Sequence, residues 1–216
     1  MNITPMGHVW HSDARHPKHV IGFTCEMATD WDAYLGHLQI YRRGEMAARP
    51  DLPDRMWIAD GASRAGKALK ALPDTFVAAE YFVVSQRVAE VMERFDLGGS
   101  ALLPVALSKK GNTDPFCGSY YIVHLTEQKA AFDPDNSNNF DKPRYEDDTY
   151  LGSVSRTRNK DDDIVCNASA VVGVDLWTDP LLLTSLMLSD PLYQALAGEE
   201  LLNNANTLRC VVSAPY

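Results

Sequence analysis

The segment from Gly61 to Ala68 carries the residue types of a phosphate-binding loop. Its sequence, GASRAGKA, places Lys67 directly after the second of two spaced glycines. Such a loop cradles phosphates with backbone N–H groups and a lysine, and it needs Ser or Thr after that lysine to hold Mg²⁺. Because Ala68 stands there, the pattern favours a Gly/Ala-rich turn. A nucleotide-binding regulator using Gly61 to Lys67 stays open as an alternative.

Four histidines near the N-terminus have a spacing at which imidazoles can bind zinc or nickel. Pro17 interrupts any helix that would align the last two, and no thiolate or carboxylate pair nearby completes a ligand set. We expect incidental surface histidines, with no metal, no cofactor and no catalytic residue; a metal-dependent enzyme is the second alternative. The four are His8, His11, His16 and His19.

A calcium-loop pattern begins at Asp133 but is not completed. Asp133, Asp135 and Ser137 place oxygen ligands at alternate positions. Asn138 stands where the sharp turn of such a loop requires glycine, and Arg144 stands where a glutamate should close the ion cage. We therefore predict no calcium site in this segment.

The secondary structure around these segments is predicted most clearly between residues 76 and 125. An apolar run ends at Ser85, a preferred N-cap, and residues 86–97 carry apolar side chains at helical spacing. The runs 101–107 and 119–125 are short and rich in β-branched or aromatic residues, with a turn-rich segment between them. These features predict a capped helix followed by two strands.

The last third of the chain contains a similar unit. Residues 164–177 are strand-like, Ser189 caps a second helix with Pro191 in its first turn, and 207–213 is a strand. The sequence predicts an α+β fold with mixed, mostly antiparallel sheets, a few short helices and one strand–helix–strand unit used twice.

The organisation along the chain divides near residue 75. Residues 19–41 alternate between apolar and polar positions, and the segment that follows has weak periodicity. We predict an N-terminal specificity lobe or small domain at 1–75, and an α+β domain at 76–216 that carries a long exposed acidic insertion at about 126–163.

Composition and charge indicate a soluble globular protein with a basic partner. The net charge of -9 and the pI near 5.1 disfavour nucleic acid and anionic membrane as partners. The N-terminus lacks the apolar run of a signal peptide, and no stretch approaches the roughly 20 apolar residues of a membrane span. We expect a cytoplasmic protein. Its four cysteines are expected to be free: Cys25, Cys117, Cys166 and Cys210.

The acidic insertion is the best candidate for a binding surface. Its carboxylates alternate with aromatic residues, and aromatic anchors rimmed by acids suit a basic protein partner, because the aromatics supply buried area and the acids supply steered association. The predicted partner-binding residues are Asp133, Asp135, Phe140, Asp141, Tyr145, Glu146, Asp147, Asp148, Tyr150, Asp161, Asp162 and Asp163.

About half of the chain resembles a known bacterial family. The resemblance lies in caps and core positions, in this order: Val84-Ser85, Asp96 to Gly98, Pro104, Tyr120-Tyr121 and Leu188-Ser189-Asp190. In this pattern the chain is similar to the immunity proteins of the eleventh polymorphic-toxin immunity family, formerly a domain of unknown function.

The resemblance implies a non-catalytic protein that binds and inhibits a cognate secreted toxin. Because this chain is acidic, we expect a basic toxin, and nucleases are basic since their substrate is polyanionic. The expectation is a nuclease effector of a type VI secretion system, blocked at its active site in a 1:1 complex. The residues that distinguish one toxin from another are expected in 1–75 and in the insertion.

Overall fold

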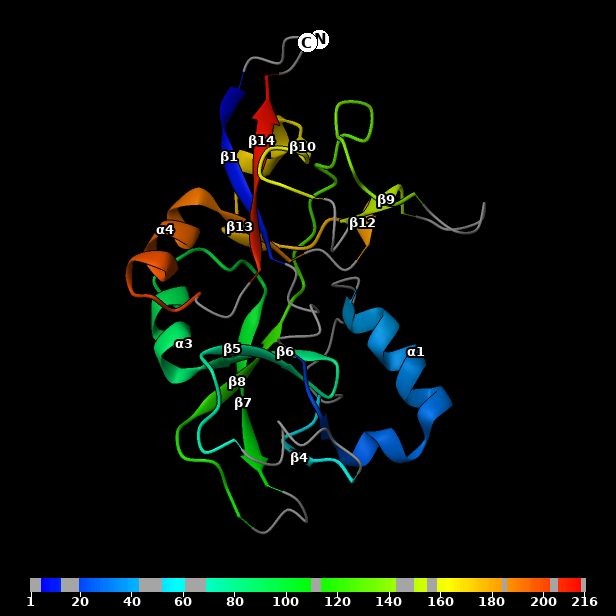
Figure 1. Ribbon diagram of the computed structural model, residues 1–216, viewed down its shortest axis with the longest axis vertical. Coiled ribbons are helices and arrows are strands. Elements are labelled where there is room, and N and C mark those ends of the chain that lie inside the picture. Colours follow the sequence, from blue (N-terminus) through cyan, green and yellow to red (C-terminus); the bar gives the residue numbers. More distant parts are fainter. Residues whose placement is uncertain are drawn as a thin grey trace.

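The computed structural model describes most of the residues of the chain. They form two sheets stacked along the long axis of the molecule, with two helices on one side and a third on the other (Figure 1). The described residues are 5–12, 20–42, 52–60, 69–109, 114–142, 150–154, 159–183, 186–202 and 206–214.

The lower sheet has seven strands in the order β2-β5-β6-β8-β7-β4-β3. Only Gly22 separates β2 from β3, so the two edges of the sheet meet there and the sheet nearly closes on itself. Closure removes the unpaired edges that would invite association with other strands. The strands are β2 (Val20–Ile21), β3 (Phe23–Thr24), β4 (Arg55–Ile58), β5 (Thr75–Ala78), β6 (Tyr81–Ser85), β7 (Ala101–Ser108) and β8 (Tyr120–His124).

Helix α1 (Trp31–Arg42) packs on this sheet after the short 3-10 helix η1 (Glu26–Thr29). Its buried side chains, Tyr34, Leu38 and Tyr41, recur at helical spacing. The Tyr34 hydroxyl donates to the Ala79 carbonyl, and the Tyr41 hydroxyl donates to a carbonyl of β8. The apolar–polar alternation seen at 19–41 therefore covers two short strands and then a helix.

The upper sheet has five strands in the order β10-β14-β1-β13-β11. The N-terminal strand β1 lies at its centre and pairs antiparallel with β13 and β14. Two further short strands pair with each other beside this sheet. The strands are β1 (Pro5–Ser12), β10 (Val165–Cys166), β11 (Leu176–Trp177), β13 (Leu186–Ser189) and β14 (Thr207–Ser213), with β9 (Gly152–Ser153) and β12 (Leu182–Leu183) alongside.

The predicted strand–helix–strand unit occurs once in each sheet. In the lower sheet, β6 and β7 are joined through helix α3 (Gln86–Met92) and lie on either side of β8. In the upper sheet, β13 and β14 are joined through helix α4 (Asp190–Gly198) and lie on either side of β1. Most strand pairs are antiparallel, so the predicted α+β class and its repeated unit are confirmed.

The two units have equivalent hydrogen bonds at the start of each helix. The Ser85 hydroxyl accepts from Val88 N and donates to the Asp74 carboxylate at 2.6 Å. The Ser189 hydroxyl accepts from Leu192 N and donates to the Asp175 carboxylate at 2.5 Å. An aromatic side chain from the central strand then bonds to the first residue of each helix: Tyr121 to Gln86, and Trp10 to Asp190.

Helices α3 and α4 lie side by side and cover the junction between the sheets (Figure 1). Their buried residues share one core with side chains of both sheets, including Val84, Val123 and Leu188. Helix α3 ends at Met92, earlier than its periodicity predicts, because Arg94 N and Phe95 N bond to carbonyls only three residues back. The predicted stop at Gly98 follows a turn in which the Asp96 carboxylate accepts from Gly98 N.

The N-terminal part of the chain contributes strands to both sheets. Strand β1 is central in the upper sheet, whereas β2, β3 and β4 complete the lower one. The division of the chain at residue 75 stays a prediction about where specificity resides.

Candidate partner-binding surface

The first part of the acidic insertion is anchored to the upper sheet, not fully exposed as predicted. Ala131 and Phe132 are buried in the core that also contains Trp177. The buried carboxylate of Asp179 accepts hydrogen bonds from the backbone N–H groups of both, at 2.9 and 2.7 Å. The few apolar residues among the acids therefore fix this segment to the sheet.

The calcium-like segment is a turn closed by its own side chains. The Asp133 carboxylate accepts from the N–H groups of Asp135 and Asn136, at 3.1 and 3.2 Å, and from the Asn136 amide. The Ser137 hydroxyl donates to the Asp133 carbonyl and accepts from Val165 N of β10. The alternating oxygen side chains stabilise a turn and dock it on the sheet. Of the predicted contacts here, Asp135 is exposed and Asp133 is half-buried.

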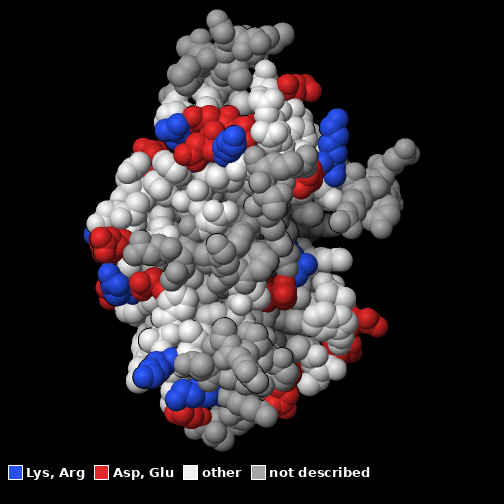
Figure 2. Space-filling view, viewed as in Figure 1, with Lys and Arg blue, Asp and Glu red and all other residues white. Residues whose placement is uncertain are grey.

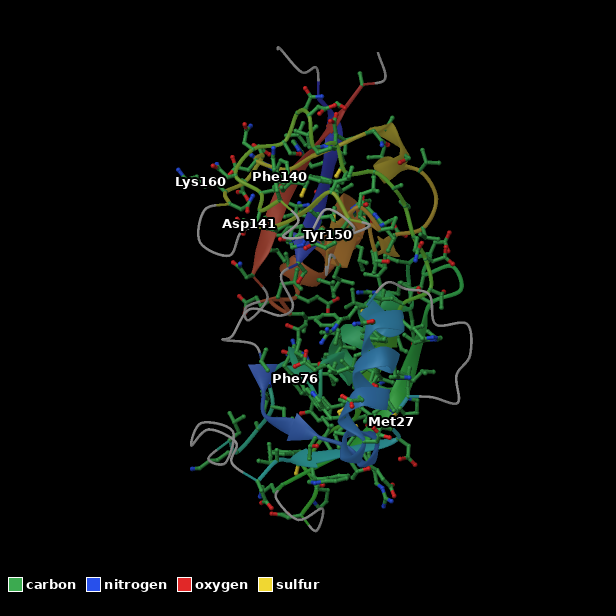
Figure 3. All side chains as sticks on the ribbon, turned by 90° about the vertical axis from the view of Figure 1, so that its right-hand side faces the viewer. Met27, Phe76, Phe140, Asp141, Tyr150 and Lys160 are labelled. Atoms are coloured by element: carbon green, nitrogen blue, oxygen red, sulfur yellow. The ribbon has the colours of Figure 1, made fainter. Side chains whose placement is uncertain are left out.

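The aromatic anchors of the insertion are half-buried. Phe140 packs edge-on against Phe132, with ring centroids 5.3 Å apart, and lies against the backbone of Gly152. A Cβ at Gly152 would lie 2.5 Å from the Phe140 ring, so glycine is required for this approach. Asp141 pairs through its backbone with Ser153, and its side chain is exposed. Figure 3 shows Phe140 and Asp141 in the upper half of the molecule together with the half-buried Tyr150.

The second acidic run, Asp161 to Asp163, lies against β14. The Asp162 carboxylate pairs with Arg209 through two hydrogen bonds of 2.8 and 2.5 Å, and the Asp161 carboxylate accepts from Arg209 N. Hydrogen bonding to Arg209 lowers the pKa of Asp162, helped by the charges of Arg209 and His8. Asp161 and Asp162 are both exposed.

The two acidic runs form one surface. Asn138 N donates to the Asp163 carbonyl at 2.7 Å, and the Asn139 amide donates to the Asp163 carboxylate at 3.1 Å. Figure 2 shows acidic side chains gathered over the region where β14 runs in Figure 1, with basic side chains beside them. Among the described residues, this acidic surface consists of Asp133, Asp135, Asp141, Asp161, Asp162 and Asp163, with Lys142, Lys160 and Arg209 as its basic neighbours.

Several predicted residues lie outside the described part of the chain. Tyr145, Glu146, Asp147 and Asp148 belong to 143–149, and their role stays a prediction. The phosphate-loop pattern at 61–68 lies outside as well.

Two of the four N-terminal histidines, which were expected to be incidental surface residues, lie in the described part of the chain. His8 and His11 lie on β1 with odd spacing, so their side chains point to opposite faces of the sheet. His11 is buried, which corrects its interpretation as a surface histidine. His16 and His19 lie outside the described residues. Among the described residues, no three His, Cys, Asp or Glu side chains are grouped so that they could hold a metal ion.

An exposed apolar feature escaped the sequence analysis. Residues 164–177 were interpreted as one or two strands, but Ala168–Val171 form a 3-10 helix, η4. Val171, the last residue of η4, and the following Val172 have 46% and 67% of their surface exposed. Consecutive valines are typical of buried strands, so only the following Gly173, which has a φ of +76°, indicates a turn.

The comparisons with known proteins identify the family. The chain is an α+β protein whose predicted motif residues occupy caps and core strands, and the model of the immunity protein family Imm11 matches residues 12–206. The chain therefore belongs to the Imm11 immunity protein family, as its caps and core positions predicted. Membership indicates a non-enzymatic inhibitor that binds a cognate toxin. No curated protein matches the chain.

None of the described helices is both long and apolar enough to cross a bilayer.

Proposed function

We propose that this immunity protein binds a basic nuclease toxin of a type VI secretion system in the cytoplasm, in a 1:1 complex that covers the toxin's active site. The observation that carries the proposal is the acidic surface, where six carboxylates stand beside three basic side chains among the described residues. A nuclease active site is basic because it must hold a polyanion. Carboxylates can occupy the positions that phosphates would take.

The arrangement of this surface supports tight binding. The Asp133 turn and the links from Asn138 and Asn139 to Asp163 hold the carboxylates in place before any partner arrives. A surface that is already ordered loses less entropy on association. The half-buried rings of Phe140 and Tyr150 add apolar area beside the charges.

The net charge of the chain supports rapid association. At -9, the protein attracts a basic partner over the range of a Debye length, about 8 Å at physiological salt. Neutralising carboxylates on the contact surface should therefore slow association most at low salt.

The test uses the purified toxin encoded by the adjacent gene. Asp135→Asn with Asp141→Asn removes two exposed charges from the acidic surface, and Glu93→Gln with Glu200→Gln removes two exposed charges elsewhere. Association rates are measured at low and physiological salt, and inhibition is measured by cleavage of DNA and RNA. A third variant neutralises Glu146, Asp147 and Asp148.

The proposal predicts that the toxin cleaves nucleic acid and that the immunity protein stops it at a 1:1 ratio. The acidic-surface variants should associate several-fold more slowly at low salt, on the order of 3- to 10-fold, and the control should not. A toxin without nuclease activity would contradict the nuclease assignment. Equal rates for all variants would contradict the location of the interface.

A further inference from the structure

A groove of about 340 Å³ lies beside the first half of β1, where Gly7, His8 and Val9 line it. It forms because β13 ends at Ser189, opposite Val9, so that Gly7 and His8 extend past the end of their neighbour. The start of α4 forms one wall, and the loop after η4 forms the other. The lining includes His8, Val171, Asp175 and Asp190.

The exposed valines stand on a loop that is held in a fixed conformation. The Asn167 side chain caps η4 by accepting from Ser169 N at 2.9 Å. Beneath the loop, the Lys129 ammonium donates to the carbonyls of Ala170 and Val174, at 3.3 and 2.7 Å. The same ammonium lies 3.8 Å from the centre of the Trp177 ring. Val171 and Val172 are therefore presented to solvent by an ordered loop.

The groove also carries negative charge beside its apolar wall. The Asp190 carboxylate accepts from Trp10 Nε1 at 2.8 Å and from the Gln194 amide, both neutral donors. The Asp175 carboxylate accepts from the Ser189 hydroxyl and from Asp96 N. Within the described part of the chain, no lysine or arginine forms an ion pair with Asp190, whereas the charge of Asp175 acts on the Lys129 ammonium beneath the loop.

The groove adjoins the acidic surface through His8. This histidine lines the groove from β1, and the neighbouring strand β14 carries Arg209, which pairs with Asp162 of the acidic surface. The groove and the acidic surface are therefore neighbouring parts of the same end of the upper sheet.

We propose that this groove and the Val171–Val172 pair form a second contact site for the toxin, one that accepts an apolar side chain flanked by a basic one. The inference rests on the proposed function, because the occupant is the cognate toxin. Exposed apolar side chains on an ordered loop are the usual centre of an interface, whereas the carboxylates of the groove select a basic neighbour. The acidic surface would then guide the toxin, and this site would retain it.

The test compares two substitutions of similar exposure. Val171→Ser with Val172→Ser removes the apolar pair, and Val171→Ile with Val172→Ile keeps the same two exposed positions apolar. Affinity for the purified toxin of the adjacent gene is measured by calorimetry, alongside the thermal midpoint of each variant. The double variant should bind about tenfold or more weakly, mainly through faster dissociation, with an unchanged midpoint. The isoleucine pair should bind like the wild type.

The outcomes separate the two proposals. If the wild type binds and the double variant binds within twofold of it, the second contact site is wrong and the proposed function stands. If the wild type does not bind the toxin at all, the proposed function fails first. Weakening by the isoleucine pair to the same degree would contradict the apolar role of these two positions.

Discussion

Replacement of Asp179 by alanine should detach the first acidic run of the insertion, Asp133 to Asp141, from the upper sheet. The side chain is 4% exposed and accepts from three backbone N–H groups: those of Ala131, Phe132 and Leu181, at 2.9, 2.7 and 2.8 Å. A hydrogen bond to a charged group contributes about 1.5–3 kcal/mol, and the variant also leaves three N–H groups without this acceptor. The cost of burying the carboxylate in the wild type offsets part of this gain.

We therefore expect Asp179→Ala to lower the free energy of unfolding by about 3–5 kcal/mol. Urea unfolding followed by tryptophan fluorescence measures this directly, because Trp177 is fully buried in the same core. A loss below about 1 kcal/mol would refute the anchoring role, since it would mean that the segment does not depend on these hydrogen bonds.

Substitution by asparagine isolates the charge. Burial raises the pKa of Asp179, and the hydrogen bonds from Leu181, Phe132 and Ala131 oppose this in part. The folded state thus binds the proton more tightly than the unfolded state does, so the group's contribution to stability is full below the unfolded pKa of about 3.9 and is lost as pH rises through the folded value. The stability of the wild type relative to Asp179→Asn should fall as pH rises from about 4 to 7. A relative stability that rises over this range would contradict the direction of the shift.

Two further predictions concern the helix ends of the repeated unit. Ser85→Ala and Ser189→Ala should each lower the free energy of unfolding by about 2–4 kcal/mol, because each serine both caps a helix and donates to a carboxylate. Chemical denaturation should give similar losses for the two variants. A loss below about 0.5 kcal/mol for either would contradict the equivalent roles of the two serines. Glu200 has a φ of +58° just after α4, where Leu201 N bonds to the Leu196 carbonyl. Glu200→Gly should therefore raise stability by about 1 kcal/mol, whereas Glu199→Gly, at a φ of -93°, should not.

Local signals predicted the parts of the fold that depend on near neighbours in sequence. Ser85 and Ser189 begin helices because a serine hydroxyl caps the N–H group three residues later, and that rule needs no tertiary context. The partner aspartates, Asp74 and Asp175, were not predicted, because they come from residues 11 and 14 positions away. Likewise, the central position of β1 in the upper sheet depends on pairing with β14, about two hundred residues later.

The sequence predicted which residues form the candidate site, but not how they are held together. The acidic runs were recognised from their charge, but their links through Asn138 and Asn139 depend on long-range hydrogen bonds that no local pattern reveals. Helix α1 was missed because alternation at 37–41 coincides with a helical spacing set by packing on the lower sheet. Val172 was missed because valine runs usually indicate buried strands.

The central claim is that this chain is an immunity protein that neutralises a toxin by direct binding. The most direct measurement is growth of cells that express the toxin of the adjacent gene, with and without this chain, followed by purification of the complex. The account predicts restored growth and recovery of both chains at a 1:1 ratio. Continued growth arrest together with no recovered complex would contradict it.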